Sequence, residues 1–411
     1  RLCHVLSNSR FLGDALNKSV ESVTWLGNDD SLQPRSRESL DIQTKATLER
    51  NAGNINDFAN SIRAMRRHEI ERIGLAWMSG VIDDEASLAG MTDVYDAAIE
   101  ASLQWAIQHR INDIQIDEAP AAIAIIGMGR YGGREVNFSS DADVIIIYRP
   151  AEGADDDQAN LFARKVQEDL RAILQGPTTF EPKIELDMDL RPEGKNGPLV
   201  RSYASCEEYY RSWASTWEHQ ALLRARYAAG DASLAEDFLM NIADPLRYPK
   251  IDLTETQIAE IRKLKARMEA ERLPRGVRRD RHLKLGKGGL SDVEWTIQLL
   301  QLQHAGDNAN LRVNGTLQAL NELEHRKLIS AGDAVVLRKA WRMCTAARNG
   351  SYLWSGRVNQ ADILPDDSYS LGGIAVYLGY DANRGQHFEN DLLAVIRKAR
   401  DVTERLFYGR S

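Results

Sequence analysis

The sequence predicts an α+β protein: a small mixed β-sheet flanked by N-terminal helices and by a C-terminal helical bundle. Two short apolar runs, "AAIAII" at 121–126 and "VIIIY" at 144–148, have the length and β-branched content of buried strands. On both sides of these runs, apolar residues recur at the three- and four-residue spacing of amphipathic helices. The change of period along the chain indicates three regions, at residues 1–115, 116–250 and 251–411.

The first region is expected to form a helical layer that packs on the second region. Two sets of apolar residues recur at helical spacing: Ile70, Ile73 and Trp77, and then Val94, Ala98, Ala101 and Trp105. The stretch "HRINDIQIDEAPA", residues 109–121, has the composition of a loop, and Pro120 marks the start of a new element.

A glycine-rich stretch comes after the first predicted strand. Gly127, Gly129 and Gly132 stand in G-x-G-x-x-G order, the written form of a dinucleotide-binding fingerprint. That fingerprint opens a helix and places an acidic residue about 20 positions on, at the end of the next strand. Here only "REVNFSS" separates Gly133 from Asp141, which enters the next strand instead. A P-loop is also excluded, because Gly-Arg stands where Lys-Ser or Lys-Thr is required. A dehydrogenase is therefore the least favoured function.

Four aspartates lie two apart on two predicted strands. Asp141 and Asp143 enter the strand "VIIIY", so their side chains point to one face. After a helix predicted at 157–174, the alternating stretch "KIELDMDLRP" predicts another strand that carries Asp187 and Asp189 on one face. Neighbouring carboxylates repel each other unless a cation lies between them, and Mg²⁺ prefers one or two carboxylates with substrate phosphates. We therefore expect a magnesium site. The alternative for the second pair is an exposed face of an edge strand.

The C-terminal region predicts a helical bundle. Three stretches have a helical pattern: "IDLTETQIAEIRKLKARMEAERL", "LSDVEWTIQLLQLQHA" and "DAVVLRKAWRMCTAARNGSYLWS". A basic, loop-like stretch, "LPRGVRRDRHLKLGKGG", separates the first two. In "GGLSDVEW", Ser291 is expected to cap the second helix, with Asp292 and Glu294 in its first turn, where acidic groups match the helix dipole.

Composition excludes several classes of protein. The formal net charge of −8 argues against a nucleic-acid partner, and no apolar run approaches the length that spans a membrane. Cys3, Cys206 and Cys344 are far apart and form no zinc motif, so we expect a reducing, cytoplasmic location without disulfides. The chain begins with Arg1, which indicates a piece of a longer protein.

Several segments together carry a family resemblance, from about residue 57 onward. "GMGRYGGREVNFSSDADVIIIY" resembles the catalytic segment of the glutamine synthetase adenylyltransferases, members of the polymerase-β-like nucleotidyltransferase superfamily. "ELDMDLRPEGKNGPLVRS", "WASTWEHQALLRARYAAGD" and "GKGGLSDVEWTIQLLQL" resemble further motifs of that family in the same order. Such enzymes contain two catalytic halves: one adenylylates a tyrosine of glutamine synthetase and the other removes the AMP by phosphorolysis. The ending "RDVTERLFYGR" is similar to the C-terminus of the adenylylating half.

The resemblance implies a set of site residues. Asp141, Asp143 and Asp187 would hold two Mg²⁺ ions, about 3.5–4 Å apart in sites of this kind. The triphosphate of ATP would be cradled by four residues that share small or hydroxyl side chains: Gly132, Gly133, Ser139 and Ser140. The candidate cations for the leaving group are Arg130, Arg191 and Lys195. Asp189 departs from the family pattern, because many members have an arginine at its position.

The resemblance also implies partners and leaves alternatives open. The expected partner is glutamine synthetase, with the PII signalling protein as a regulator. The loop before "LSDVEW" is expected to close over the nucleotide, with Lys284 and Lys287 nearby, and the alternative is that its acids only cap the helix. The reverse chemistry, phosphorolytic deadenylylation that yields ADP, is the nearest alternative function. A regulatory binding module with a vestigial site is another, and the intact pair of Asp141 and Asp143 argues against it.

Overall fold

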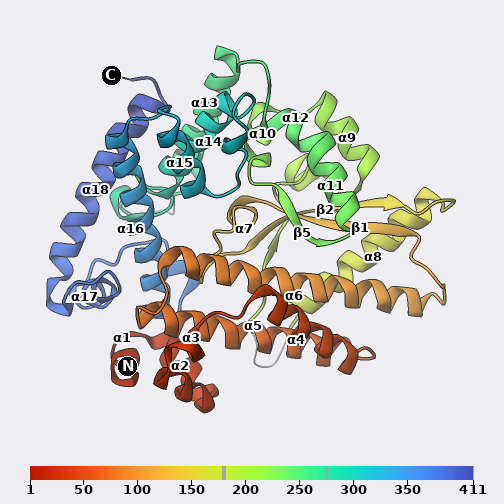
Figure 1. Ribbon diagram of the computed structural model, residues 1–411, viewed down its shortest axis with the longest axis horizontal. Helices are drawn as coiled ribbons and strands as arrows, with labels where there is room; N and C mark the ends of the chain where they lie inside the picture. The colour runs from red at the N-terminus through yellow and green to blue at the C-terminus, as the bar shows by residue number, and fades with distance from the viewer. Residues whose placement is uncertain (178–181, 274–275, 411) are drawn as a thin grey trace.

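A computed structural model describes residues 1–177, 182–273 and 276–410 of the chain. A small β-sheet lies at the centre, with two long helices along one side and a helical bundle at one end (Figure 1). The long helices are α5 (Ile55–Met78) and α6 (Asp84–Asp113). The predicted α+β class is therefore confirmed.

The N-terminal layer consists of helices with well-formed caps. Before the two long helices it contains α1 (Leu2–Asn8), α2 (Arg10–Lys18), the 3₁₀ helix η1 (Val20–Gly27), α3 (Asp29–Leu32) and α4 (Arg37–Arg50). Asn54 caps α5 by accepting from the backbone N–H groups of Asn56 and Asp57. Asp83 caps α6 by accepting from the N–H of Ala86. Since α5 ends at Met78 and α6 begins at Asp84, only a short turn joins the two helices.

The sheet mixes antiparallel and parallel pairs. Its strands are β1 (Ala121–Gly127), β2 (Ala142–Pro150), β3 (Leu186–Asp187), β4 (Val200–Ser202) and β5 (Arg226–Gly230). The order is β3-β2-β1-β5, and β4 also pairs with β2. β1 is antiparallel to β2 and β5, whereas β3 and β4 run parallel to β2. The two strands predicted from apolar runs are thus the central strands of the sheet.

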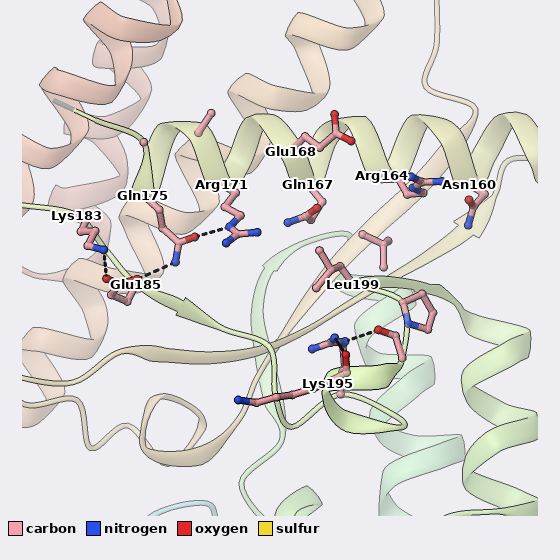
Figure 2. A pocket seen from close by; sticks show the side chains of 16 residues that line it. Asn160, Arg164, Gln167, Glu168, Arg171, Gln175, Lys183, Glu185, Lys195 and Leu199 are labelled. Atoms are coloured by element: carbon pink, nitrogen blue, oxygen red, sulfur yellow. Dashed lines mark hydrogen bonds and ion pairs between the residues drawn. The ribbon is translucent and has the colours of Figure 1, made fainter.

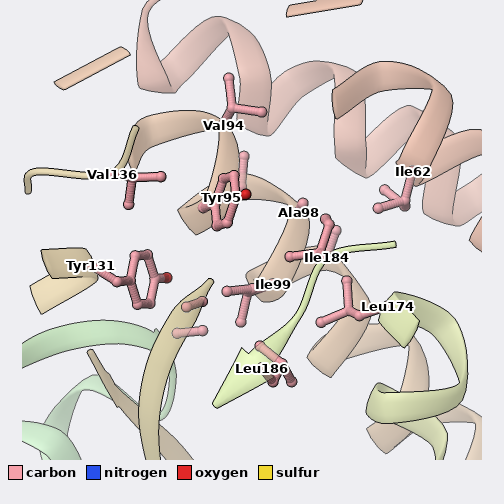
Figure 3. Packing of buried hydrophobic residues seen from close by; sticks show 14 of the residues in the cluster. Ile62, Val94, Tyr95, Ala98, Ile99, Tyr131, Val136, Leu174, Ile184 and Leu186 are labelled. Carbon is pink, nitrogen blue, oxygen red and sulfur yellow. The ribbon is translucent and has the colours of Figure 1, made fainter. Parts of the chain in front are cut away.

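Both faces of the sheet are covered, which explains the nearly continuous apolar sequence of its central strands. Val144 and Ile146 pack with the N-terminal helices and α8 (Asp156–Gln175), whereas Ile145 and Ile147 face helices from later in the chain. Figure 3 shows Tyr95 of α6 close to Tyr131 and near the apolar side chains of the β3 segment. The N-terminal helices and the sheet therefore share one core.

The other face of the sheet and the end of the molecule are helical. Covering the sheet are α9 (Tyr203–Ser212), α10 (Thr216–Leu222), α11 (Ala232–Asp237), the π-helix η3 (Phe238–Ala243) and α12 (Asp244–Arg247). The C-terminal bundle contains α13 (Glu255–Glu271), the 3₁₀ helix η4 (Arg279–Arg281), α14 (Leu290–His304), η5 (Ala309–Leu311), α15 (Thr316–His325), α16 (Ala331–Ser355), η6 (Val358–Gln360), α17 (Ser368–Tyr377), η7 (Ala382–Arg384) and α18 (Gly385–Leu406). A separate apolar core, which includes Trp341 and Phe388, holds the bundle together.

Two sequence-based predictions of secondary structure are wrong. The stretch 183–192 is a strand only at Leu186–Asp187, because Asp187 Oδ1 accepts a hydrogen bond of 2.7 Å from the N–H of Asp189 and the chain turns there. The loop predicted at 109–121 begins late, since α6 continues to Asp113.

Candidate active site

The glycine-rich turn brings backbone against a carboxylate. Immediately after β1, the N–H of Met128 donates to the carbonyl oxygen of Asp143 at 2.8 Å. Gly129 has φ +53°, and a Cβ atom at this position would lie 2.1 Å from Asp143 Oδ2. Only glycine allows both the left-handed conformation and this close approach. Gly129 of the G-x-G-x-x-G pattern therefore makes room for the Asp143 side chain, and the pattern is not the start of a dinucleotide-binding helix.

Three carboxylates gather where β2 begins. Asp143 and Asp187 are register partners on the parallel strands β2 and β3, so their side chains leave the sheet on the same face. Asp141 lies directly before β2. Burial, together with the charges of Asp141 and Asp187, raises the pKa of Asp143 to about 7. Burial also raises the pKa of Asp187, with the charges of Asp189 and Asp141 adding to the effect. The predicted trio is therefore one electrostatic unit.

The trio suits a cation, although it is not a preformed ligand cage. Within the described ranges, no group of three acidic, histidine or cysteine side chains stands ready to hold a metal ion. The carboxylates of Asp141 and Asp143 accept no hydrogen bond and make no ion pair with any described residue. Mg²⁺ commonly takes one or two carboxylates and completes its shell with water and substrate phosphates. The donor set fits an ion that arrives with a nucleotide.

Cations lie on both sides of the three carboxylates. The Lys284 ammonium and the Arg130 guanidinium lower the pKa of Asp143, and Lys195 acts in the same way on Asp187. Burial lowers the pKa of Lys284, and the charges of Arg348 and Arg130 add to this effect. The Lys284 ammonium makes no hydrogen bond or ion pair with a described residue, and so it is available to a ligand.

Arg130 belongs to a buried charge network that joins the sheet to the bundle. Its Nη2 donates to Glu294 of α14 at 2.5 Å, while Nε and Nη1 have no partner among the described residues. Nearby, Arg348 of α16 is paired with Asp362. The sequence indicated Arg130 as a candidate cation, but nothing in the spacing of Glu294, Arg348 and Asp362 could have joined them to the site. The network exists only because the bundle packs against the glycine turn.

The residues predicted to cradle phosphates have other partners. The N–H groups of Gly132 and Gly133 donate to Met128 and Gly129 within the turn. A Cβ atom on Gly132 would lie 2.0 Å from the carbonyl oxygen of Arg224. The structure therefore favours a packing role for these two glycines over phosphate contact.

The two predicted serines are tied to the turn that precedes Asp141. The hydroxyls of Ser139 and Ser140 both donate to Asn137 Oδ1, at 3.1 and 2.9 Å. Both side chains are half-buried. Phosphate contact by these hydroxyls would require them to leave Asn137, and so it stays a prediction.

The loop after β3 separates the remaining candidates. Arg191 is buried and donates to the carbonyl oxygens of Met188, Lys195 and Gly197, so its guanidinium holds the loop together. The Lys195 side chain is exposed and forms an ion pair of 3.2 Å with Asp189. The alternation predicted that Asp189 continues the strand. In the structure Asp189 instead lies in the turn after β3. Of the two cations, Lys195 is the exposed one, and contact with a substrate would require it to leave Asp189.

A groove extends from the carboxylates along α8. A cleft of about 420 Å³ contains Asp141, Asp187 and Asp189. It shares five residues with a larger neighbouring cleft of about 1000 Å³: Arg171, Glu185, Arg191, Lys195 and Leu199. Figure 2 shows one wall of the larger cleft formed by α8 and the opposite wall by the loop that carries Lys195 and Leu199. Asp141 and Asp187 therefore open onto a long surface groove, whereas Asp143 does not line it.

The motif "GGLSDVEW" is mainly structural. Gly289, not the predicted Ser291, is the N-cap of α14. Asp292 is buried, pairs with Lys265 and Arg400, and accepts the N–H of Gly288 at 2.6 Å. This is more than dipole matching, because it ties α14 to α13 and α18. The preceding loop places Lys284 beside the acids, whereas Lys287 is exposed.

No described helix combines the length and apolar content needed to cross a membrane. The family model "Glutamate-ammonia ligase adenylyltransferase" matches residues 1–241, and the model "GlnD PII-uridylyltransferase" matches residues 261–407. The first match includes the sheet and the three carboxylates, and the second covers most of the C-terminal bundle.

Curated relatives share one name, bifunctional glutamine synthetase adenylyltransferase/adenylyl-removing enzyme. A relative from Bifidobacterium longum (strain DJO10A) is 78% identical over 411 residues, all of this chain and 38% of the relative. Relatives from Leifsonia xyli and Mycobacterium avium are 42% and 40% identical, and the aligned segments are 39% and 41% of their lengths. The chain thus spans about two fifths of these proteins. With the model match over more than half of its residues, the chain belongs to the glutamate-ammonia ligase adenylyltransferase family.

Proposed function

We propose that this chain transfers AMP from ATP to a tyrosine hydroxyl of glutamine synthetase and releases pyrophosphate. The observation that carries the proposal is the group of three carboxylates, two of them without hydrogen-bond donors, between Lys284 and Lys195. Acids held together in this way are costly unless a cation and a polyphosphate complete the site. The family membership and the shared name of the relatives support the same chemistry.

The side chains of this chain have distinct tasks in such a transfer. Lys284 and Arg130 offer positive charge near Asp143, where the leaving pyrophosphate gains negative charge. Asp187 Oδ2 would accept a hydrogen bond from the acceptor hydroxyl, a role supported by the occupation of Oδ1 by the N–H of Asp189. A tyrosine hydroxyl has a pKa near 10, so a carboxylate that draws on its proton makes the oxygen a better nucleophile.

Asp141, Asp143 and Asp187 are the residues that would hold Mg²⁺. When bound, Mg²⁺ neutralises charge on the phosphates and helps to polarise the attacking oxygen. The attack on the α-phosphorus and the departure of pyrophosphate leave AMP on the tyrosine oxygen. Most of the acceleration then comes from positioning and charge complementarity.

The principal alternative is the reverse reaction on the same scaffold. The relatives' name includes "adenylyl-removing enzyme", and one set of carboxylates serves either direction. In that reaction inorganic phosphate attacks the phosphorus of the AMP group, the bond to the tyrosine oxygen breaks, and the products are ADP and the free tyrosine hydroxyl. The PII protein is a proposed regulator in either case, supported by the match of the C-terminal bundle to the PII-uridylyltransferase model.

One experiment separates the two directions. The full-length enzyme is incubated with Mg²⁺, glutamine synthetase and ATP labelled on the α-phosphate, and the modified residue is mapped by mass spectrometry. The control is the full-length enzyme with Asp141→Asn in this chain. It measures any AMP transfer that is catalysed by a part of the enzyme outside this chain. Labelling that persists in the variant at the wild-type rate rules out the proposal. ADP formation from phosphate and adenylylated glutamine synthetase, lost in the variant, supports the alternative.

A further inference from the structure

The groove along α8 has no task in the transfer of AMP itself. It is lined on one side by a single face of α8, from Asn160 to Gln175, and on the other by residues 195–200. We infer that this groove binds an extended, acidic segment of the acceptor protein, which leads the tyrosine hydroxyl to Asp187. The inference rests on the proposed function and adds the surface that selects the acceptor.

The dimensions of the groove suit a peptide segment. The 15 residue steps from Asn160 to Gln175, at about 1.5 Å each, correspond to roughly 22 Å of helix. At about 3.3 Å per residue, an extended chain of six or seven residues covers that length. The volume of about 1000 Å³ is available beside the acids, in continuity with the smaller cleft that contains Asp187.

The charges of the groove favour an acidic occupant. Its lining includes five cationic residues, Arg164, Arg171, Lys183, Arg191 and Lys195, but only two acidic ones, Glu168 and Glu185. Both acids already pair with lysines, namely Lys165 and Lys183. Arg164 has no hydrogen-bond or ion-pair partner among the described residues, and Arg171 uses only Nε, which donates to Gln175. Positive charge therefore remains available in a chain whose net charge is −8.

The order of the groups across the sheet places the acceptor on this side. Asp187 is on the edge strand β3, next to Lys195 and the groove, whereas Lys284 and Arg130 lie beside Asp143 on β2. In an in-line displacement the nucleophile and the leaving group occupy opposite sides of the phosphorus. With the pyrophosphate toward Lys284, the hydroxyl must approach from Asp187, where the groove ends.

The amides on the same face of α8 are suited to backbone recognition. Asn160 and Gln167 line the groove, and Gln167 Nε2 is buried without a hydrogen-bond partner in the described part of the chain. In Figure 2, Gln167 and Arg171 extend from α8 toward the loop that carries Leu199 and Lys195. An extended segment in the groove would offer a carbonyl oxygen to the Gln167 amide, while its acidic side chains meet the arginines. The Asn160 amide already donates to the Tyr148 hydroxyl at 3.0 Å.

The test uses two charge reversals in the full-length enzyme. Arg164→Glu lies in the groove. Lys45→Glu is the control, because Lys45 is exposed on α4 and does not line the groove; Lys165 is unsuitable since it pairs with Glu168 of the lining. The dissociation constant for unmodified glutamine synthetase is measured without ATP, and KM for both substrates is measured at low ionic strength. For Arg164→Glu we expect about a tenfold increase in the dissociation constant and in KM for glutamine synthetase, reduced by added salt. KM for ATP stays unchanged, and the control stays within about twofold.

Each outcome decides one question. Equal constants for the two variants, with AMP transfer intact, overturn the groove inference and leave the proposed function in place. A higher KM for ATP alone also overturns it, because the groove would then hold the nucleotide. Weaker binding of glutamine synthetase by Arg164→Glu in an enzyme whose wild type transfers no AMP supports the groove and contradicts the proposed function.

Discussion

Asp143 in the sheet and Asp292 in the bundle are both shielded aspartates, but the molecule surrounds them in opposite ways. Asp292 pairs with Lys265 and Arg400 and accepts the N–H of Gly288, so its neighbours lower its pKa. Asp143 has no such partner, and burial and two neighbouring carboxylates raise its pKa to about 7. The bundle pairs its buried charges, whereas the sheet leaves Asp143 without a partner among the described residues. Unpaired charge, and not burial as such, is what marks the candidate site.

The largest difference is expected from Asp143→Asn. AMP transfer should fall about 10³-fold, since a carboxylate that helps to hold a catalytic cation contributes several kcal/mol to transition-state stabilisation. The rate of AMP incorporation, measured with the full-length enzyme, checks this expectation. The fold should be retained, because the substitution removes repulsion. If Asp143→Asn unfolds the protein, Asp143 contributes to stability as Asp292 does, and the comparison is wrong.

The equivalent change in the bundle, Asp292→Asn, should act on stability. It removes one carboxylate from Lys265 and Arg400, which keep Glu269 and Glu404 as partners, so we expect a loss of about 2–3 kcal/mol of unfolding free energy, below the cost of a fully unpaired buried charge. Urea denaturation measures the loss. The control is Asp41→Asn, whose side chain is 46% exposed in an ion pair with Arg37 and should cost at most about 1 kcal/mol. Equal losses for both variants would contradict the comparison.

A smaller effect is expected from Gly129→Ala. The new Cβ would meet Asp143 Oδ2 and displace that carboxylate, so we expect transfer to fall about 10- to 100-fold. Gly80→Ala is the matched control. Gly80 also has a positive φ, +69°, but nothing lies within 4 Å of its Cβ position. Both variants lose about 1 kcal/mol from backbone strain, and only the first should lose activity. Comparable activity in both would mean that the site tolerates a shifted Asp143.

The smallest effect is the pH dependence of stability without divalent cations. Because the folded pKa of Asp143 lies above its unfolded value of 3.8, the folded state retains the proton longer, and stability falls as pH rises from about 4 through about 7. Asp292 has the opposite sign: its contribution is present above the unfolded pKa and is lost as pH falls. Asp143→Asn should therefore be about 1–2 kcal/mol more stable than wild type at pH 8 and equal at pH 4.

Denaturation curves at the two pH values, with and without Mg²⁺, measure this dependence. Added Mg²⁺ should narrow the gap at pH 8, because a cation beside Asp143 relieves the repulsion. A gap that is the same at both pH values would show that Asp143 does not titrate in this range.

Much of the fold can be derived from local patterns. The runs 121–126 and 144–148 are central strands because both faces of the sheet are buried, and the helices α8, α14 and α16 coincide with the apolar periodicity. Asp141, Asp143 and Asp187 could be proposed from spacing and resemblance, and register pairing brings Asp143 beside Asp187. Their role in catalysis stays a prediction.

The sequence by itself determined the two central strands, the main helices and the position of Asp141 and Asp143 at the start of a strand, because these depend on neighbours a few residues away. Only the tertiary structure showed that Arg191 donates to the loop that follows it, that Gly132 and Gly133 are packed against Arg224, and that Lys284 approaches the acids from the bundle. Those outcomes depend on contacts across about 90 residues or more, or on a turn that Asp187 itself creates. Local periodicity has no information about which distant charge will arrive to pair with an acid, or whether any will.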